Sequence, residues 1–350
     1  MMTIRQAHRQ DKVAWDEFIL SHTNAAAYSL FAWKEAVETA YGHKGLYLLA
    51  EKNGKVCGAL PLICFGTPWG SKSLVALPYC DTGEVLADSP DIRNQLIGTA
   101  VDLARSMSVD RLEIRSSMAG LLNNFATTNV QVQTSKVRMV LQLPASSELL
   151  WNSFKSKLRS QIRKAEKNGL TFRWGNVADL ESFYHVFSRN MHMLGSPVHS
   201  RHWLQQVVER FGRHAKMGMI FKGTRPIGCG MILSTRHTVS IPWASTLREF
   251  NRLSPNMLLY WKFLEFAADH EKKVFDFGRS TLNEGTYRFK SQWGAKPHPL
   301  YWYRFFPAGT DSGHSAAISG KRQILASIWT RIPLGLANFI GPNIRKYISL

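Results

Sequence analysis

Apolar runs of strand length occur along the chain in two pairs, each joined by a short turn. The first pair covers residues 46–50 and 56–60, and Asn53-Gly54 between them is the dipeptide that type I′ hairpin turns prefer. The second pair covers 217–221 and 227–232, with a glycine and a proline in its turn. The pattern predicts two β-hairpins, far apart in the sequence.

Each hairpin is followed by the same two elements. Periodic apolar positions predict a helix near 91–107 after the first hairpin and near 255–270 after the second. After each helix comes a short strand that ends in Arg-Ser, at Arg115-Ser116 and at Arg279-Ser280. This order predicts an α/β (α+β) protein with two copies of one unit, and coincidental hairpins are the alternative.

The length of the chain also favours two domains. A chain of 350 residues fits two domains of about 150 residues better than one. We place the boundary near Pro144 to Ser147, between the two copies. The expected domains are therefore 1–146 and 147–308, followed by a linker and a basic segment at 309–350.

A strongly periodic helix is predicted at the start of the second copy. Apolar side chains recur at three- and four-residue steps from Trp151 to Ala165, and Asn168-Gly169 is a typical C-terminal stop. Lysines and arginines surround this apolar face, with one glutamate among them. The helix is either a solvated basic face or an anion-binding surface, for which the candidates are Arg159, Arg163 and Lys164.

Ser254-Pro255 predicts the start of another helix, with Ser254 as the N-cap and Pro255 at the first helical position. The free N–H groups of a helix start can bind a phosphate. The preceding residues, 248–253, contain no glycine, which weakens the case for a pyrophosphate-binding turn. Ser254 is a candidate donor-binding residue, and an ordinary capped core helix is the alternative.

The strand at 275–280, Phe-Asp-Phe-Gly-Arg-Ser, opens into a loop of turn residues. Strand ends of this kind often hold ligands in α/β proteins. Arg279 at the strand end and Lys290 shortly after it supply two positive charges, and Tyr287 and Trp293 lie beside Lys290 in the sequence. The segment is a candidate anion site, and an ordinary basic surface loop is the alternative.

The run from Arg279 to Tyr303 resembles the C-terminal signature of FemAB-like acyltransferases, with Lys290, Trp293 and Gly294 as its most specific part. The likeness extends over about 149–306 and is greatest to the exosortase (PEP-CTERM)-associated branch. It implies two tandem GNAT-like domains, each a mixed sheet flanked by helices. It also implies an N-acyltransferase that transfers an acyl or aminoacyl group to an amine of a cell-envelope or exopolysaccharide precursor.

In such a reaction the amine attacks an activated carbonyl, and a fixed cation stabilises the resulting oxyanion. Lys290 is the candidate for this role or for binding a donor phosphate. Arg279 would bind a phosphate or carboxylate in bidentate fashion, and Tyr287 would donate a hydrogen bond. The remaining candidates for binding substrate or donor are Trp243 as a cleft residue, Asp276 as a proton acceptor or a structural residue, and Ser280. No obligatory general base can be identified.

The net charge of the chain limits the classes of partner that it could bind. The chain has 44 Lys+Arg against 25 Asp+Glu, a formal net charge of +19, which favours nucleic acid, a phospholipid surface or a phosphorylated substrate. We expect aminoacyl-tRNA or acyl-CoA as co-substrate, with no bound cofactor. The four cysteines and the histidines lack the spacing of metal ligands, so no metal is expected.

The C-terminal segment combines charge with an apolar stripe. Residues 321–350 include five basic and no acidic residues, and prolines and glycines interrupt the apolar positions. We expect an amphipathic segment in peripheral contact with an anionic membrane, with a helix packed on the protein's own core as the alternative. No apolar run approaches a membrane span and no signal peptide is visible, so a cytoplasmic protein is expected.

Two other functions fit the sequence. One is an acyl-CoA-dependent acetyltransferase that acts on an amino sugar, and the other is a non-catalytic basic protein that binds tRNA or membranes. Stimulation by aminoacyl-tRNA or by acyl-CoA would separate the two enzymes. The absence of turnover with either donor would favour the binding protein.

Overall fold

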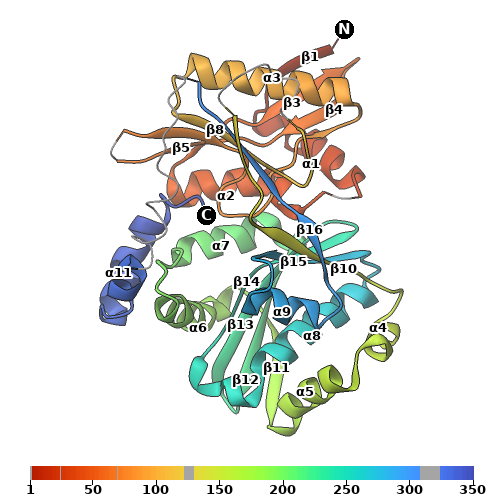
Figure 1. The fold of residues 1–350 in the computed structure, drawn as a ribbon, viewed down its shortest axis with the longest axis vertical. Coiled ribbons are helices and arrows are strands. Elements are labelled where there is room, and N and C mark those ends of the chain that lie inside the picture. The colour runs from red at the N-terminus through yellow and green to blue at the C-terminus, as the bar shows by residue number, and fades with distance from the viewer. Residues whose placement is uncertain (1, 24, 69, 122–129, 308–323) are drawn as a thin grey trace.

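Two lobes, each built of β-sheet and helices, are stacked one above the other in the protein (Figure 1). The computed structural model describes residues 2–23, 25–68, 70–121, 130–307 and 324–350. The upper lobe in Figure 1, here the first lobe, holds most of the N-terminal part of the chain. The lower or second lobe holds most of the remainder.

The first lobe contains two sheets. Its strands are β1 (Met2–Gln6), β2 (Lys44–Gly45), β3 (Leu48–Lys52), β4 (Lys55–Leu60), β5 (Ile63–Gly66), β6 (Lys72–Val75), β7 (Leu86–Ala87), β8 (Arg111–Ser116), β9 (Val130–Gln133) and β17 (Tyr301–Phe305), and its helices are α1 (Lys12–Ser21), α2 (Phe31–Tyr41), α3 (Pro90–Ser106) and the 3-10 turns η1 (Arg9–Asp11) and η2 (Ala27–Ser29). The strand orders are β1-β3-β4-β7 and β2-β5-β6-β8-β17-β9. The predicted helix near 91–107 is confirmed as α3, which packs against β3, β4 and β8.

The second lobe is built on one mixed sheet. Its strands are β10 (Val137–Gln142), β11 (Leu170–Gly175), β12 (Ala215–Lys222), β13 (Arg225–Ser234), β14 (Thr238–Thr246), β15 (Val274–Ser280) and β16 (Lys296–Pro299), and its helices are α4 (Ser147–Ser153), α5 (Ser156–Lys167), α6 (Leu180–Met193), α7 (Arg201–Phe211), α8 (Pro255–Asp269), α9 (Gly285–Ser291), α11 (Leu334–Arg345) and the 3-10 turns η3 (Val177–Asp179), η4 (Gly212–His214) and η5 (Arg248–Leu253). The strand order is β11-β12-β13-β14-β15-β10-β16.

Helices cover both faces of this sheet because its side chains alternate between them. Met217, Met219 and Met231 join the core that contains α6, whereas Ile220 and Ile232 join the core that contains α8. The predicted helix near 255–270 is thereby confirmed as α8.

Both predicted hairpins are present. Asn53 and Gly54 have φ angles of 53° and 75°, and two positive φ values in succession are the mark of a type I′ turn. The second hairpin joins β12 to β13, with Lys222 paired to Arg225. The strands that end in Arg-Ser are β8 and β15.

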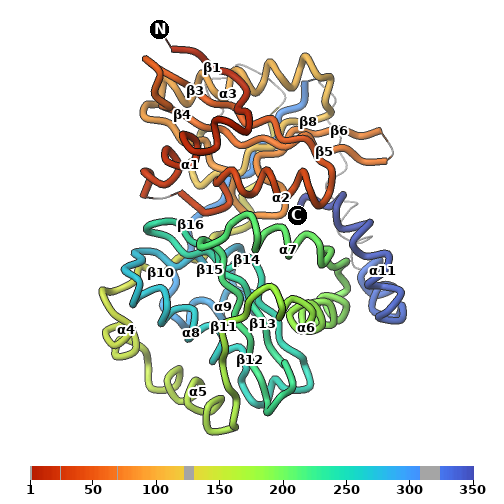
Figure 2. Tube along the Cα trace, turned by 180° about the vertical axis from the view of Figure 1, so that it is seen from behind, coloured from red at the N-terminus to blue at the C-terminus, as the bar shows by residue number. Residues whose placement is uncertain are grey.

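The two lobes exchange strands. β10 precedes the expected boundary at residue 146, but it pairs with β15 and β16 in the second lobe. β17 lies C-terminal to the second-lobe sheet, but it pairs with β8 and β9 in the first lobe. Figure 2 shows the corresponding crossings of the chain between the lobes. The boundary expected from the sequence therefore does not coincide with a change of sheet.

The predicted basic helix is two helices, so the prediction of one continuous helix from Trp151 to Ala165 is wrong. α4 ends at Ser153 and α5 begins at Ser156 because Phe154 has an extended backbone, with ψ of 143°. The extended residue turns the Phe154 ring into the core, 5.8 Å from the ring centroid of Trp261 and 5.6 Å from that of Trp293. Packing of this aromatic side chain outweighs helix continuity.

The described part of the C-terminal segment is packed on the protein, which agrees with the alternative of a helix packed on the protein's own core, and its contact with an anionic membrane stays a prediction. Ala337 and Gly341 on α11 are buried, and Asn338 donates a hydrogen bond to Ser188 on α6. The last residues reach the first lobe, where Ser349 O accepts from the backbone of Tyr79 and Lys346 O accepts from the Tyr79 hydroxyl. Several separate contacts hold this segment on the protein, and its prolines and glycines interrupt it.

Removal of residues 346–350 should destabilise the protein. The truncation takes away the acceptors of the Tyr79 N–H and hydroxyl groups and of His43 Nε2, and each donor left without a partner costs about 1–3 kcal/mol. With three such donors, we expect the free energy of unfolding to fall by about 3 kcal/mol or more in urea titrations. A truncated protein as stable as the full chain would contradict this packing.

Candidate functional site

Lys290 lies at the C-terminal end of β15, where the two lobes meet. α9 turns this side chain back onto the strand, and its Nζ donates to the carbonyl oxygens of Gly278 at 3.1 Å and Arg279 at 2.8 Å. The residue is 8% exposed, and burial lowers the pKa of its ammonium group to about 8. An ammonium group has three N–H donors, so these two bonds leave one for a ligand.

Asp81 of the first lobe fixes the same strand end. Its carboxylate accepts from the backbone N–H of Arg279 at 2.8 Å and lies 3.4 Å from Arg279 Nε. Gly278 has a φ of 74°, and a Cβ at this position would lie 3.1 Å from the Asp81 carboxylate. A glycine is therefore required beside Arg279 both for the left-handed backbone and for the approach of Asp81.

The Arg279 guanidinium lies over the indole ring of Trp302, at 5.1 Å from its centroid. Arg115 lies over the same ring at 4.5 Å. Trp302 is on β17, and its Nε1–H donates to the carbonyl oxygen of Asp81. The exchanged strand therefore carries the aromatic surface on which the predicted anion-binding arginine rests.

Both carboxylate oxygens of Asp276 bind other groups of the protein. Its Oδ2 lies 2.7 Å from Arg138 Nε, and its Oδ1 accepts from the backbone N–H of Gly278 at 2.8 Å. Burial lowers the pKa of Arg138, but the Asp276 carboxylate outweighs burial and the pKa is raised overall. Because both Asp276 oxygens are occupied, the arrangement favours the structural alternative over a free proton acceptor.

Three further predicted residues lie on β15, on α9 and before α8. Ser280 is buried, and its hydroxyl has no hydrogen-bond partner among the residues that the structure describes. Tyr287 on α9 packs against the second-lobe core with a partly buried ring. Ser254 precedes α8 with a φ of 63° and makes no side-chain cap, so its predicted capping role is wrong: the left-handed backbone does not bring the hydroxyl to the first-turn N–H groups.

Trp243 is a buried core residue, which does not favour its predicted role in a cleft. Its side chain is buried in the core of the second lobe. The ring lies 6.4 Å from that of Trp203 and 6.5 Å from that of Phe187. The preceding Pro242 continues strand β14 and does not open it to solvent.

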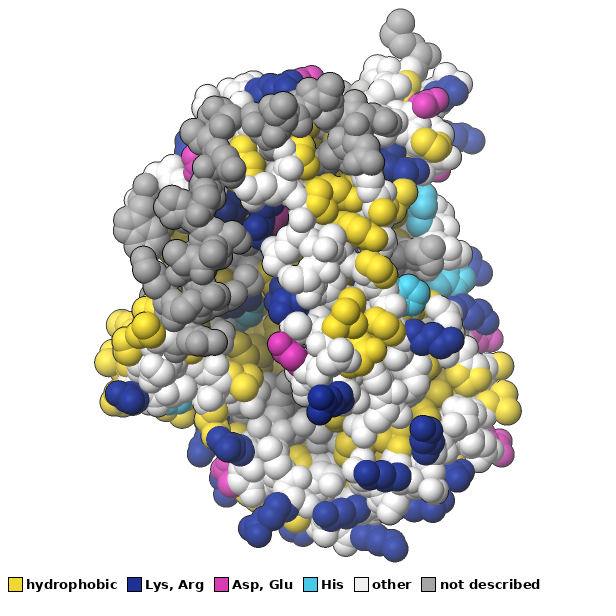
Figure 3. Space-filling model, viewed as in Figure 1, with side chains coloured by type: hydrophobic (Ala, Val, Ile, Leu, Met, Phe, Trp, Pro, Cys, Tyr) yellow, Lys and Arg dark blue, Asp and Glu magenta, His cyan; other side chains and the backbone are white. Residues whose placement is uncertain are grey.

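The basic helix α5 exposes its charges. Arg163 and Lys164 are exposed and Arg159 is partly buried, and the Arg163 guanidinium lies over the ring of Trp151 at 5.3 Å. Figure 3 shows many Lys and Arg side chains over the second lobe. These three residues are on a different element from Lys290, which is on α9, and from Arg279, which is on β15.

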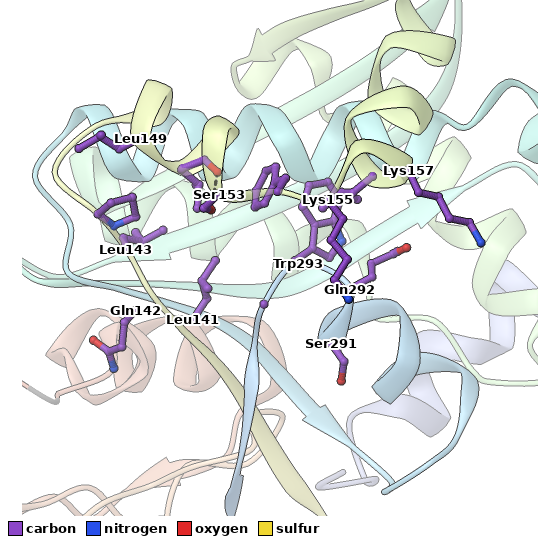
Figure 4. A pocket seen from close by; sticks show the side chains of 15 residues that line it. Leu141, Gln142, Leu143, Leu149, Ser153, Lys155, Lys157, Ser291, Gln292 and Trp293 are labelled. Atoms are coloured by element: carbon purple, nitrogen blue, oxygen red, sulfur yellow. Dashed lines mark hydrogen bonds between the residues drawn. The ribbon is translucent and has the colours of Figure 1, made fainter.

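A hollow of about 540 Å³ lies between α5 and the C-terminal end of α9. Figure 4 shows Leu141, Leu143 and Leu149 on one side and Lys155 and Trp293 on the other. The hollow thus combines apolar walls with a basic rim. It lies on one face of β10, and α9 joins it to the strand end that Lys290 contacts.

A second hollow of about 430 Å³ lies on the other side of β10, at the lobe junction. Its walls include Glu84 and Ser117 of the first lobe and Arg138 and His298 of the second. Glu84 is held by hydrogen bonds from the Ser116 hydroxyl at 2.6 Å and the Ser117 N–H at 2.7 Å. Arg138 connects this hollow to the charged strand end through Asp276.

Sequence reasoning missed Asp81, Arg138 and Glu84. Asp81 and Glu84 lie in an irregular segment far from the β15 motif in the sequence, and Arg138 occupies one position of a short strand. No local pattern distinguishes these residues from other polar residues. Among the described residues, no group of His, Cys, Asp and Glu could hold a metal ion.

Part of the second lobe is similar to a known protein family. Residues 152–291 match the family model described as an acetyltransferase (GNAT) domain. A search of curated proteins finds no match. In the described part of the chain, no helix is both long and apolar enough to cross a membrane.

Solved structures resemble most of the chain in fold. FemX gives a TM-score of 0.69 at 13% identity, over 87% of this chain and 97% of that chain. The L-PGS from Bacillus licheniformis gives 0.58 at 11% identity, over 93% and 98%. A tandem GNAT protein from the clavulanic acid biosynthesis pathway gives 0.53 at 12% identity, over 87% and 98%. The chain thus has the tandem GNAT-like fold that the resemblance in sequence implied, and residues 152–291 of its second lobe are similar to the GNAT acetyltransferase domain.

Proposed function

We propose that the protein is an N-acyltransferase that transfers an acyl or aminoacyl group from an anionic donor to an amine of a cell-envelope or exopolysaccharide precursor. The observation that carries this proposal is the pair of cations at the end of β15, within the GNAT domain, where Lys290 keeps one N–H donor available. The similarity to FemX supports the tandem fold, and the class of acceptor rests on the resemblance of the 279–303 segment to FemAB-like acyltransferases. Membership of the exosortase-associated branch stays a prediction.

Lys290 would stabilise the oxyanion that forms when the amine attacks the acyl carbonyl. A buried ammonium group acts strongly on developing charge because little water screens it. Arg279 lies next to it on the strand and would bind a phosphate or carboxylate of a substrate. Its contacts with Asp81 and Trp302 hold it in place before the substrate arrives.

The two hollows provide separate places for donor and acceptor. The 540 Å³ hollow, with Lys155 and Lys157 at its rim, suits a ligand with apolar and anionic parts. The 430 Å³ hollow, with the Glu84 carboxylate in its wall, suits a positively charged amine before deprotonation. β10 separates them because successive strand residues face opposite sides, and Gln142 contributes to both.

The donor is either acyl-CoA or aminoacyl-tRNA. The GNAT domain favours acyl-CoA, whereas the glycine-free turn η5 and the uncapped Ser254 lack the features of a pyrophosphate-binding helix start. A screen by mass spectrometry should combine acyl-CoA thioesters and aminoacyl-tRNAs with amino-sugar and peptidoglycan-precursor amines. Transfer to an amine is expected with one donor class, and the absence of transfer in every combination would contradict the proposal.

Charge reversal on α5 tests whether the donor binds to the basic surface of this helix. Replacing Arg159, Arg163 and Lys164 by glutamate should weaken binding of a polyanionic donor and flatten its salt dependence, lowering the slope of log K against log[salt] by about 2–3. The measurement is donor binding over a series of salt concentrations. A matched control replaces three exposed lysines of the first lobe, Lys44, Lys52 and Lys55. If both variants weaken donor binding equally, α5 is only a solvated basic face.

A further inference from the structure

A helical hairpin at the C-terminal end of the described chain is fixed on the outside of α6. We define this C-terminal hairpin as residues 324–345, which comprise the helical residues 324–329 and α11. His192 Nε2 lies 2.8 Å from the carbonyl oxygen of Ile332, and Ala326 packs directly against Gly195. The hairpin is therefore a structured surface of the second lobe.

Only some of the apolar residues of the C-terminal hairpin face the protein. Ala337 and Gly341 are buried, and Trp329 lies against Gly341. Leu336 and Phe339, three residues apart on the other side of α11, are 50% and 77% exposed. This spacing places them on one outward face of the helix.

The exposed face extends beyond α11. Large apolar side chains that are at least two-fifths exposed occur in all three adjoining segments: Ile324, Leu325 and Ile328, then Leu336, Phe339 and Ile344, and Met193 and Leu194 at the end of α6. Figure 3 shows hydrophobic side chains gathered at the left edge of the molecule, over α11. Single exposed apolar residues are ordinary, whereas a contiguous group marks an interaction surface.

The charge around this surface indicates what it binds. The charged residues of 324–350 are Arg331, Arg345 and Lys346, all of them positive, and the whole chain carries a formal charge of +19. An apolar face with a basic rim fits the interface of an anionic membrane, where buried apolar area and attraction to lipid phosphates add together. A second copy of the chain fits less well because association would bring two strongly positive molecules together.

We propose that the outer face of the C-terminal hairpin docks on the surface of an anionic phospholipid membrane. The helices would lie in the plane of the interface, with the apolar side chains among the lipid headgroups. The segment that follows the hairpin is bonded to Tyr79 and His43 of the first lobe. Docking would therefore hold both lobes of the enzyme close to the membrane. This inference concerns a surface distinct from the β15 strand end and stands independently of the proposed reaction.

Co-sedimentation of the full chain with vesicles tests this docking. Vesicles of equal parts phosphatidylglycerol and phosphatidylcholine should bind the protein, and vesicles of phosphatidylcholine alone should bind it more weakly. Replacing Leu325, Ile328 and Phe339 together by glutamate should weaken partitioning to the anionic vesicles on the order of 100-fold, because it removes apolar burial and adds like charge to the lipid. The melting temperature should stay unchanged because these side chains are exposed.

A matched control replaces three exposed valines elsewhere, Val13, Val132 and Val177, by glutamate. This variant has the same change in net charge and should keep most of the vesicle binding. Full-length protein that ignores anionic vesicles, or a hairpin variant that binds as well as the control, would overturn the proposal. A dimer in analytical ultracentrifugation that the hairpin substitutions dissociate would assign the surface to a second copy instead.

Discussion

Replacement of Lys290 by alanine is expected to lower kcat by about 10²–10³-fold, the range typical of a lost oxyanion donor. The Nζ group is buried at the end of β15 and fixed by two carbonyl oxygens, so its remaining N–H is preorganised. The measurement is steady-state kinetics with the donor and acceptor that the mass-spectrometric screen identifies. Arg288→Ala is the matched control, because Arg288 is an exposed basic residue on the same helix.

The pH dependence separates catalysis by Lys290 from a purely structural role. Its pKa is lowered to about 8 from 10.5, so activity that needs the ammonium form should fall as the pH rises through about 8. Stability should respond with the opposite sign: between about 8 and 10.5 the unfolded chain binds more protons than the folded one, so this group makes the folded state more stable as the pH rises.

Lys290→Met preserves most of the side-chain volume and should abolish both pH effects. If the alanine and methionine variants keep full activity, or lose activity only because they unfold, Lys290 does not stabilise the oxyanion. Comparing the melting temperature and kcat of the two variants makes this distinction.

Replacement of Glu113 by alanine is expected to lower the free energy of unfolding by about 3–5 kcal/mol, the usual cost of breaking a buried ion pair. The Glu113 carboxylate lies 2.6 Å from Arg115 Nη2 and 2.8 Å from Arg304 Nε, and the residue is 1% exposed. Its removal leaves Arg115 buried without its carboxylate partner. Because Arg115 and Arg279 share the ring of Trp302, the change should also disturb the candidate site.

Urea titration measures this loss, and Glu265→Ala is the control. Glu265 pairs with Lys262 at the surface of α8, where an ion pair is worth about 0–1 kcal/mol. Burial raises the pKa of Glu113, but Arg115 and Arg304 outweigh burial and hold it at about 2. The stability that this group contributes is therefore present above its ordinary value of 4.5 and is lost as the pH falls toward 2. A loss no larger than that of the control would contradict the buried network.

Turn chemistry and apolar periodicity predicted the repeated hairpins, α3, α8 and the strand end at Arg279, because these features depend on residues close in sequence. The candidate site was predicted only in part. Lys290, Arg279 and Asp276 come together because one strand and the helix after it carry all three. Tandem GNAT-like domains came from a resemblance in sequence, which the fold confirms.

The other features of the fold and of the candidate site depend on tertiary structure alone. The exchange of β10 and β17 between the lobes, the contact of Asp81 with Arg279 and the pairing of Arg138 with Asp276 join segments that are distant along the chain. The break at Phe154 and the packing of α11 follow from aromatic and helix contacts with such distant segments. Local sequence determines which elements form, but it carries no signature of which distant partner each element meets, because many alternative pairings satisfy the same apolar pattern.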